Sequence, residues 1–314
     1  MTMLYTDPLF LEHETGKHPE KAERLRAITA RLEKADLIKK CTAGTYKPLS
    51  EETVAKLHSA KMVHAVKTLA DHGGGQLDAD TIISKKSFTV GLAAAGACVA
   101  AVDAVLKGDE RTALCLVRPP GHHATPTRSM GFCLFNNIAL AATHAKTAHK
   151  LNKVLIVDFD VHHGNGTQDI FYEDGQVMFF SIHRYGRGFY PGTGAADETG
   201  KGKGKGNILN APIAFGTSRK DYHAAFKKAL EKAAETIKPE LVLLSAGFDA
   251  HAKDPIGSLG LEVEDFVTMT KEVLEVAKTH AKGRLVSCLE GGYNLEVLAE
   301  SVQAHLEELL AAKS

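Results

Sequence analysis

The residues best suited to chemistry lie in the segment Asp158–Gly166, which reads DFDVHHGNG and directly follows the apolar run Val154–Val157. Side chains alternate along a strand, so Asp158, Asp160 and His162 are expected on one face. Two carboxylates and one imidazole are typical ligands of a divalent metal such as zinc. The glycines that follow allow the chain to turn sharply. Alone this segment is weak evidence, because Asp and His at a strand end also cap helices.

Three other apolar runs end in similar glycine-containing turns. They are Thr112–Val117, which leads to His122 and His123, Leu241–Ser245, which leads to Asp249, and Arg284–Leu289, which leads to Tyr293. Parallel neighbouring strands end at one edge of a sheet, where α/β proteins bind ligands. We therefore expect these side chains to converge, which capping alone does not explain.

The metal site that the pattern predicts consists of Asp160, His162 and Asp249. Three protein ligands leave one coordination position for water and substrate, which is typical of a catalytic rather than a structural site. A bound zinc ion lowers the pKa of its water toward ~7 and polarises a carbonyl oxygen. The pattern favours hydrolysis of an amide or an ester.

Hydrolysis also requires proton transfer and a donor for the developing oxyanion. His122 and His123 follow a Pro-Pro-Gly turn, and the prolines restrict its geometry. Asp158 could accept a hydrogen bond from one imidazole and set its tautomer. Tyr293 could supply a phenol opposite the metal. The alternatives are two surface histidines in a loop and a half-buried core tyrosine.

The elements that must position these residues are readable from the apolar pattern. Two further runs, Lys153–Phe159 and Val177–Ile182, are nearly continuous in apolar residues, as in strands buried on both faces. Helical patterns separate the runs: Pro19–Leu32, Ser84–Leu106, Ile138–Lys150, Arg219–Ile237, Glu262–Lys282 and Leu295–Ala312. The alternation predicts one α/β domain over residues 1–314, with helices on both faces of a parallel sheet.

Composition excludes several classes of partner. Lys plus Arg (38) equals Asp plus Glu (38), so no global charge favours nucleic acid or a membrane surface. The 5 cysteines are odd in number and lack CxxC spacing, as expected of reduced thiols. No signal peptide is evident, and the apolar stretches read as too short or too interrupted for a membrane span. These features predict a cytoplasmic protein, in which Gly200–Gly206 forms a flexible, solvated loop.

Taken together, the motifs resemble those of the histone deacetylase family, in the arginase/deacetylase superfamily. The matching segments are HPEKAERL (18–25), RPPGHHA (118–124), GFCLFNNIA (131–139), DFDVHHGNGTQDIF (158–171), SIHR (181–184), YPGTG (190–194), AGFDAH (246–251) and LEGGYN (289–294). The likeness covers nearly the whole chain, and the motifs occur in the family's order.

The resemblance implies a fold, a mechanism and a set of ligands. The fold would be a single domain with a central, mostly parallel eight-stranded sheet flanked by helices. His123 would act as general base and then general acid, His122 paired with Asp158 would tune the charge, and Tyr293 would bind the substrate carbonyl. The remaining implied positions are Asp160, His162 and Asp249 for zinc; Asp158, Asp160, His162, Ser181 and Ile182 for potassium; Phe171, Asp174, Val177 and Asn207 for a second monovalent ion; and Gly131, Phe132 and Tyr190 for the acyl-lysine channel.

Asn165 indicates which class of this family the chain resembles. Class I members carry Asp at this position, as the partner of the histidine that corresponds to His123. Asparagine together with the RPPGHH form resembles class II enzymes and the bacterial deacetylase-like amidohydrolases. Tyr293 is present, unlike in the poorly active class IIa enzymes, so the resemblance implies activity.

Substrate choice is less constrained. Relatives that deacetylate polyamines use an acidic gatekeeper where this chain has Ile256, which argues against that selectivity. Asp78 or Asp80 could hold a peptide backbone, and Glu14–Pro19 is expected at the rim of the pocket. The main hypothesis is an acyl-lysine deacetylase acting on proteins or peptides. The alternatives are an acetylpolyamine amidohydrolase, a non-catalytic binder of acylated ligands and a binuclear manganese ureohydrolase. Acyl length, zinc or iron as the metal, and oligomeric state remain open.

Overall fold

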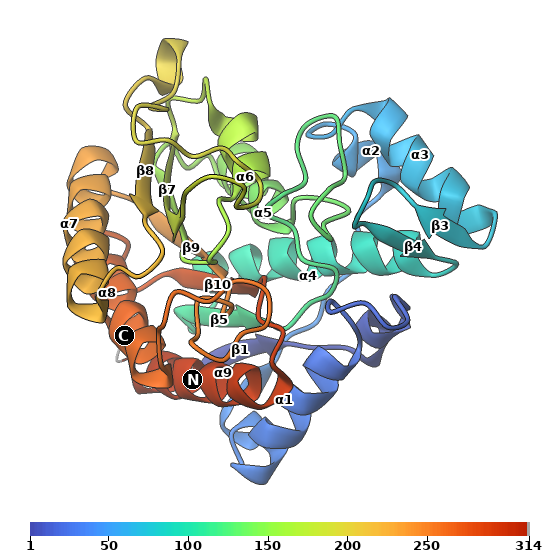
Figure 1. Ribbon diagram of the computed structural model, residues 1–314, viewed down its shortest axis with the longest axis horizontal. Helices are drawn as coiled ribbons and strands as arrows, with labels where there is room; N and C mark the ends of the chain where they lie inside the picture. The colour runs from blue at the N-terminus through green and yellow to red at the C-terminus, as the bar shows by residue number, and fades with distance from the viewer. Residues whose placement is uncertain (313–314) are drawn as a thin grey trace.

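One parallel sheet of eight strands organises the molecule in the computed structural model, which describes residues 1–312 (Figure 1). The strand order is β2-β1-β5-β10-β9-β6-β7-β8, and every pairing in the sheet is parallel. The strands are β1 (Thr2–Tyr5), β2 (Thr42–Ala43), β5 (Thr112–Cys115), β6 (Val154–Asp158), β7 (Val177–Arg184), β8 (Ile208–Ile213), β9 (Leu241–Ala246) and β10 (Leu285–Leu289). The predicted fold is confirmed.

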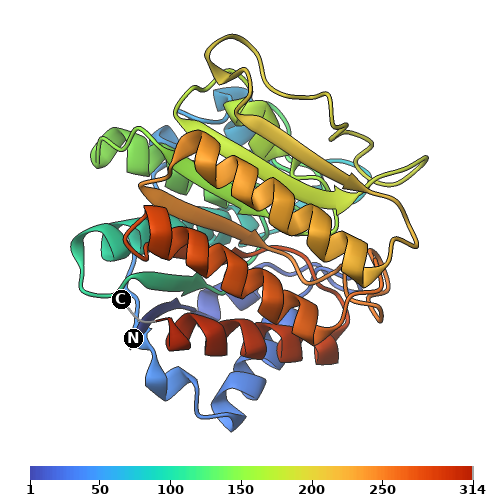
Figure 2. The ribbon, with the colours of Figure 1, turned by 90° about the vertical axis from the view of Figure 1, so that its left-hand side faces the viewer.

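Helices cover both faces of this sheet. Helices α7 (Arg219–Ile237), α8 (Val263–His280) and α9 (Leu295–Ala311) lie side by side across one face, as Figure 2 shows. Helices α4 (Ser87–Lys107) and α5 (Asn137–Ala148) pack against the other face, while α1 (Glu23–Lys34) packs on α9. The shorter elements are α2 (Glu51–Val54), α3 (Ala60–Asp71), α6 (Asn165–Phe171) and an antiparallel pair, β3 (Gly74–Gln76) with β4 (Ile82–Ser84).

The central strands and their helices form because of where their apolar residues fall. Every residue of β5, β6, β9 and β10 is buried, which matches their continuous apolar character. In α7, Tyr222, Phe226 and Leu230 recur at four-residue spacing and are buried on one face. Fully burying one such side chain stabilises the fold by about 1.5–3 kcal/mol. Ser218 begins the helix by accepting a hydrogen bond from the amide of Asp221.

Several elements escaped prediction because their local signals are weak. Strands β1 and β2 are four and two residues long. Strand β8 lies at the sheet edge, and only part of its residues are buried. Helix α3 lies in a region for which the sequence yielded no prediction, and α6 begins directly after the DFDVHHG segment.

Helix α4 corrects the expectation that no apolar stretch is long enough for a membrane span. Its 21 residues suffice by length and composition, yet 61% of its most apolar window is buried inside this fold. The helix packs against the sheet and against α5, so its apolar residues form part of the interior of the protein.

The glycine- and lysine-rich segment is only partly the solvated loop that was expected. Its lysines, Lys201, Lys203 and Lys205, are exposed. Gly204, in contrast, is buried, and a Cβ atom there would lie 2.6 Å from the carbonyl oxygen of Tyr172. The segment therefore packs its backbone against the chain that follows α6.

Candidate active site

Four neighbouring strands bring the predicted catalytic residues together. β5, β10, β9 and β6 are consecutive in the sheet, and all four run in the same direction. Their carboxyl ends lead to His122 and His123, to Tyr293, to Asp249 and to Asp160 with His162. The expected convergence at one sheet edge is confirmed.

The three predicted metal ligands form a tight, buried cluster. Nδ1 of His162 lies 3.1 Å from Oδ1 of Asp160 and 3.1 Å from Oδ2 of Asp249. The donor atoms of all three residues lie within 4.8 Å of one another. Backbone amides fix the carboxylates, since Gly291 donates to Asp160 and Val161 donates to Asp249. This donor set fits a zinc-type divalent ion with an open position.

The charges in this cluster also favour a cation. Burial raises the pKa of Asp249, and the nearby charge of Asp160 raises it further, to about 7. Burial alone would raise the pKa of Asp160 too, but the positive charges of His122 and His162 hold it below its usual range. Two carboxylates forced together in this way are destabilised by mutual repulsion, which a bound divalent cation would relieve.

Glycines beside the cluster are required by space. A Cβ atom on Gly247 would lie 2.0 Å from Oδ2 of Asp160, and one on Gly291 would lie 2.2 Å from Oδ2 of Asp249. A Cβ atom on Gly164 would lie 2.2 Å from Oδ2 of Asp158. Gly164 has a φ of −73°, so the sharp turn expected there does not depend on left-handed backbone. It depends on the close approach of the α6 N-terminus to the site.

The two adjacent histidines have different partners and opposite electrostatics. Nδ1 of His122 lies 3.0 Å from Oδ2 of Asp158, and Nδ1 of His123 lies 2.7 Å from Oδ1 of Asn165. Burial alone would lower the pKa of His122, but the charges of Asp158 and other nearby carboxylates hold it well above its usual value. Burial and the neighbouring His122 hold the pKa of His123 well below its usual value. His123 therefore suits the role of a neutral base.

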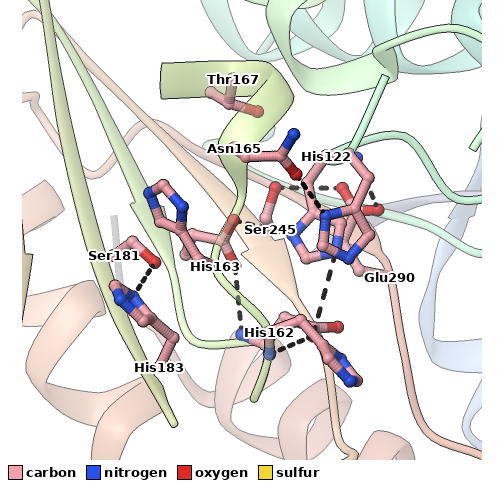
Figure 3. A network of polar contacts seen from close by, with 12 residues as sticks. His122, His162, His163, Asn165, Thr167, Ser181, His183, Ser245 and Glu290 are labelled. Carbon is pink, nitrogen blue, oxygen red and sulfur yellow. Dashed lines mark hydrogen bonds and ion pairs between the residues drawn. The ribbon is translucent and has the colours of Figure 1, made fainter. Parts of the chain in front are cut away.

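Glu290 is a site residue that sequence reasoning missed. Its carboxylate accepts hydrogen bonds from the amides of Gly121 (2.7 Å) and His122 (3.2 Å) and from the hydroxyl of Ser245 (3.0 Å). Figure 3 shows Glu290 and Ser245 beside His122. Burial raises the pKa of Glu290 to about 7. A glutamate placed directly after a fully buried strand was the signal that could have identified it.

Tyr293 is held from two sides. Its amide donates to Oδ2 of Asp254 (2.8 Å), and the guanidinium of Arg24 lies 5.0 Å from its ring centroid. Nε of Arg24 donates to the carbonyl of Gly292 (2.7 Å). The sequence reading assigned no role to Arg24 or Asp254, although both lie in or next to segments that it singled out.

Arg24 belongs to a buried charge network beneath the site. Nη1 of Arg24 lies 3.3 Å from Oε1 of Glu20, and Nη2 of Arg118 lies 2.7 Å from Oε2 of the same glutamate. All three side chains are at most 1% exposed. Burial opposes ionisation, but Arg118 and Arg24 lower the pKa of Glu20 to about 2. The network anchors the first helix to the turns that carry His122 and Tyr293.

Aromatic rings surround the site. Phe132 packs edge-on against Tyr293 with a centroid distance of 5.7 Å, and Tyr190 packs edge-on against His123 at 5.0 Å. Gly131 has a φ of 57°, and a Cβ atom there would lie 2.5 Å from the ring of His123. Phe189, which sequence reasoning did not single out, stacks on His162 at 5.1 Å. Gly131, Phe132 and Tyr190, which are predicted to line an acyl-lysine channel, thus lie beside His123 and Tyr293.

The two acidic rim residues differ in their contacts. Oδ1 of Asp78 accepts hydrogen bonds from the amides of Asp80 and Thr81, so its carboxylate stabilises its own loop. The side chain of Asp80 is half-buried, and its backbone carbonyl contacts Nε2 of His18 at 3.1 Å. His18 in turn packs on Phe132 at 4.4 Å, as expected of the rim segment Glu14–Pro19. The carboxylate of Asp80 accepts a hydrogen bond from the hydroxyl of Thr81 (3.2 Å), and both aspartates stay candidates for holding a substrate.

Ile256 lies in the loop that supports Tyr293. It is half-buried, and its amide donates to Oδ1 of Asp254 (2.9 Å). The other oxygen of this carboxylate holds Tyr293, which connects the predicted gatekeeper position to the catalytic tyrosine. An apolar residue at this position is consistent with the sequence reading.

The potassium positions stay a prediction. Ser181 pairs with Asp158 in the β6–β7 register, with Ile182 next along β7, and Oγ of Ser181 lies 2.9 Å from Nδ1 of His183 (Figure 3). At the second predicted position, the amide of Asp174 donates to the carbonyl of Phe171, and Asn207 donates to the carbonyl of Asp174. Val177 begins β7 nearby. The ammonium of Lys146 pairs with Asp174, so this position already has a cation.

Comparisons with known proteins identify proteins that are similar to this chain in sequence and in fold. The histone deacetylase domain model matches residues 18–309. Histone deacetylase 14, chloroplastic, of Arabidopsis thaliana is 37% identical over 99% of this chain and 77% of its own length. The histone deacetylase-like amidohydrolase of Pseudomonas aeruginosa is 38% identical over 95% of this chain and 78% of its own length. The human polyamine deacetylase HDAC10 is 42% identical over 93% of this chain and 44% of its own length. A crystal structure of the HDA15 HD domain superposes with a TM-score of 0.93 at 37% identity, covering 99% of this chain and 88% of that one.

Proposed function

The chain belongs to the histone deacetylase family of hydrolases, and on this basis we propose that it removes acetyl or related acyl groups from the ε-amine of lysine in proteins or peptides, with zinc as its metal. The observation that carries the proposal is the meeting of a base, an oxyanion donor and a metal-binding triad at one sheet edge. A protein that only bound acylated ligands would not need the opposite electrostatics of His122 and His123.

Different residues of the chain perform different parts of the proposed reaction. Zinc held by Asp160, His162 and Asp249 would supply Lewis acidity toward water and the substrate carbonyl. His123, neutral and oriented by Asn165, accepts the proton of the attacking water and then delivers it to the leaving amine.

His122 and Tyr293 stabilise the charge that develops during this reaction. His122 keeps a positive charge beside Asp158 and so stabilises the negative charge of the tetrahedral intermediate. The phenol of Tyr293 donates a hydrogen bond to the substrate carbonyl oxygen. Asp254 and Arg24 hold the backbone from which this phenol extends.

Peptide substrates are favoured over polyamines by the rim. The half-buried Ile256 offers no charge to attract a second amine of a polyamine. Asp80, half-buried beside the channel residues, offers an acceptor for the backbone amides of a peptide. The 42% identity to a polyamine deacetylase keeps acetylated polyamines as the second candidate substrates.

A substrate screen tests this proposal. The enzyme is assayed on acetyl-lysine peptides, longer acyl-lysine peptides and acetylpolyamines, with chelator-treated enzyme as the control. We expect a higher kcat/KM on the peptides and loss of all activity with the chelator. An Ile256→Glu variant should shift the ratio toward acetylpolyamines. A strong preference of the wild type for acetylpolyamines would replace the main hypothesis by the second one. A Tyr293→Phe variant that is as active as the wild type would exclude both.

A further inference from the structure

Two histidines and an aspartate form a second cluster of metal-ligand type on the helical layer formed by α4 and α5. Asp103 lies near the C-terminal end of α4, His144 lies in the last two turns of α5, and His149 directly follows α5. None of them belongs to the strand ends that build the active site. The three side chains are 39%, 27% and 12% exposed, so solvent ions can reach them.

The geometry of this cluster is convergent. Nε2 of His144 lies 2.9 Å and Nε2 of His149 lies 2.5 Å from the same atom, Oδ1 of Asp103. The donor atoms of the three residues lie within 4.8 Å of one another, as in the active-site triad. In that triad, which has two carboxylates and one imidazole instead of one and two, the nitrogen-to-oxygen distances are 3.1 Å.

We propose that Asp103, His144 and His149 bind a divalent transition-metal ion through one carboxylate oxygen and two imidazole Nε2 atoms. Two imidazoles and a carboxylate are a donor set that suits zinc, nickel and copper. The remaining coordination positions are taken by water, because the cluster is open to solvent. The ion would join the C-terminal ends of α4 and α5, which the contacts of His144 and His149 with Asp103 already connect.

The surroundings favour a cation at this position. The C-terminal end of a helix carries a partial negative charge, and the ends of α4 and α5 meet here. Nζ of Lys107 lies 3.4 Å from the same Oδ1 of Asp103 and already places one positive charge there. Lys107 is 69% exposed, so its side chain can swing away when a metal ion binds.

The active-site triad also binds metal, so the test counts ions beyond the first. Zinc-loaded, active enzyme is titrated with Ni²⁺ by calorimetry, and metal per chain is measured after desalting. We expect the wild type to bind one further ion with micromolar affinity. His149→Ala should weaken this step by at least tenfold, and Asp103→Asn should do the same. The control is His64→Ala, which removes an exposed histidine from α3 and should titrate like the wild type.

Two results would overturn the proposal. One is a wild type that takes up no ion beyond the first. The other is a His149→Ala variant with an unchanged second binding step. A variant that fails to fold is recognised by a lowered melting temperature in the presence of chelator. If His149→Ala fails in this way, the second binding step of Asp103→Asn, which keeps the shape of the side chain, tests the proposal instead. Deacetylase activity should be the same in wild type and both variants, so this test is independent of the proposed catalytic function.

Discussion

His123 donates its Nδ1–H to the side-chain oxygen of Asn165 across 2.7 Å, so a neutral amide orients the histidine that we propose as the base. This leaves Nε2 of His123 without a proton and free to accept one. The adjacent His122 instead contacts the carboxylate of Asp158. Burial and the neighbouring His122 lower the pKa of His123, while nearby carboxylates raise that of His122, and the neutral amide of Asn165 adds no negative charge beside His123.

Replacing the amide by a carboxylate should change the pH dependence of the reaction. In an Asn165→Asp variant, the new negative charge raises the pKa of His123, and a protonated His123 cannot act as a base. As the pH is lowered, the variant should therefore lose activity at a higher pH than the wild type does. The acidic limb of its kcat/KM profile should move up by about one pH unit. The measurement is a pH–rate profile of both enzymes. Superimposable acidic limbs would contradict the assignment of His123 as the base.

Removing the phenol of Tyr293 should affect catalysis rather than metal binding. A Tyr293→Phe variant keeps the ring beside Arg24 and Phe132 but loses the donor to the developing oxyanion. Loss of one such donor costs roughly 10²–10³ in kcat. Steady-state kinetics should show this fall with little change in KM, and the metal content should match the wild type. A variant with lower metal content would instead assign Tyr293 a structural role.

Substitution of Glu290 should damage the protein as much as substitution of a predicted metal ligand. Glu290→Ala leaves two buried amides and the hydroxyl of Ser245 without their acceptor. Each unsatisfied group costs about 1–3 kcal/mol. Urea unfolding should show this loss, and kcat should fall because the turn carrying His122 loosens. Glu290→Gln retains an acceptor and is the matched control, so equal losses in both variants would point to charge rather than anchoring.

Stability should decline in mild acid because several histidines are buried in the neutral form. Burial lowers the pKa values of His58 and His183 to about 4 and that of His305 to about 3. The unfolded chain binds these protons near pH 6.5, so below this pH it holds more protons than the folded state. The free energy of unfolding should be largest above pH 6.5 and fall as the pH drops toward 4.

Urea titrations between pH 8 and pH 5 check this expectation. His305 contacts Thr270 and Ser287, so a His305→Gln variant keeps polar atoms near both partners but removes one titrating group. The variant should show a shallower decline with pH than the wild type. An unfolding free energy that is equal at pH 8 and pH 5 would mean that these histidines do not control acid stability.

Sequence reasoning succeeded where a single local pattern determines the outcome. The continuous apolar runs identified the central strands, and the polar residue after each run identified the site. It failed where position depends on distant contacts. Glu290 functions through amides 168 and 169 residues away, and Arg24 through a carbonyl 268 residues away. The contacts of Asp78 and Asp80 likewise depend on the folded loop, in which Asp78 binds backbone amides and Asp80 binds the hydroxyl of Thr81.

The back wall of the catalytic site has a consequence for engineering and for natural variation. A Cβ atom added to Gly164, Gly247 or Gly291 would lie 2.2, 2.0 or 2.2 Å from a carboxylate oxygen. Even one added methyl group would therefore displace a carboxylate of the site. Substitutions at these positions should therefore be as damaging in a mutational scan as loss of Asp160 itself. Attempts to redesign the metal preference are thereby confined to the ligands and the solvent side, since this wall has no room for a larger residue.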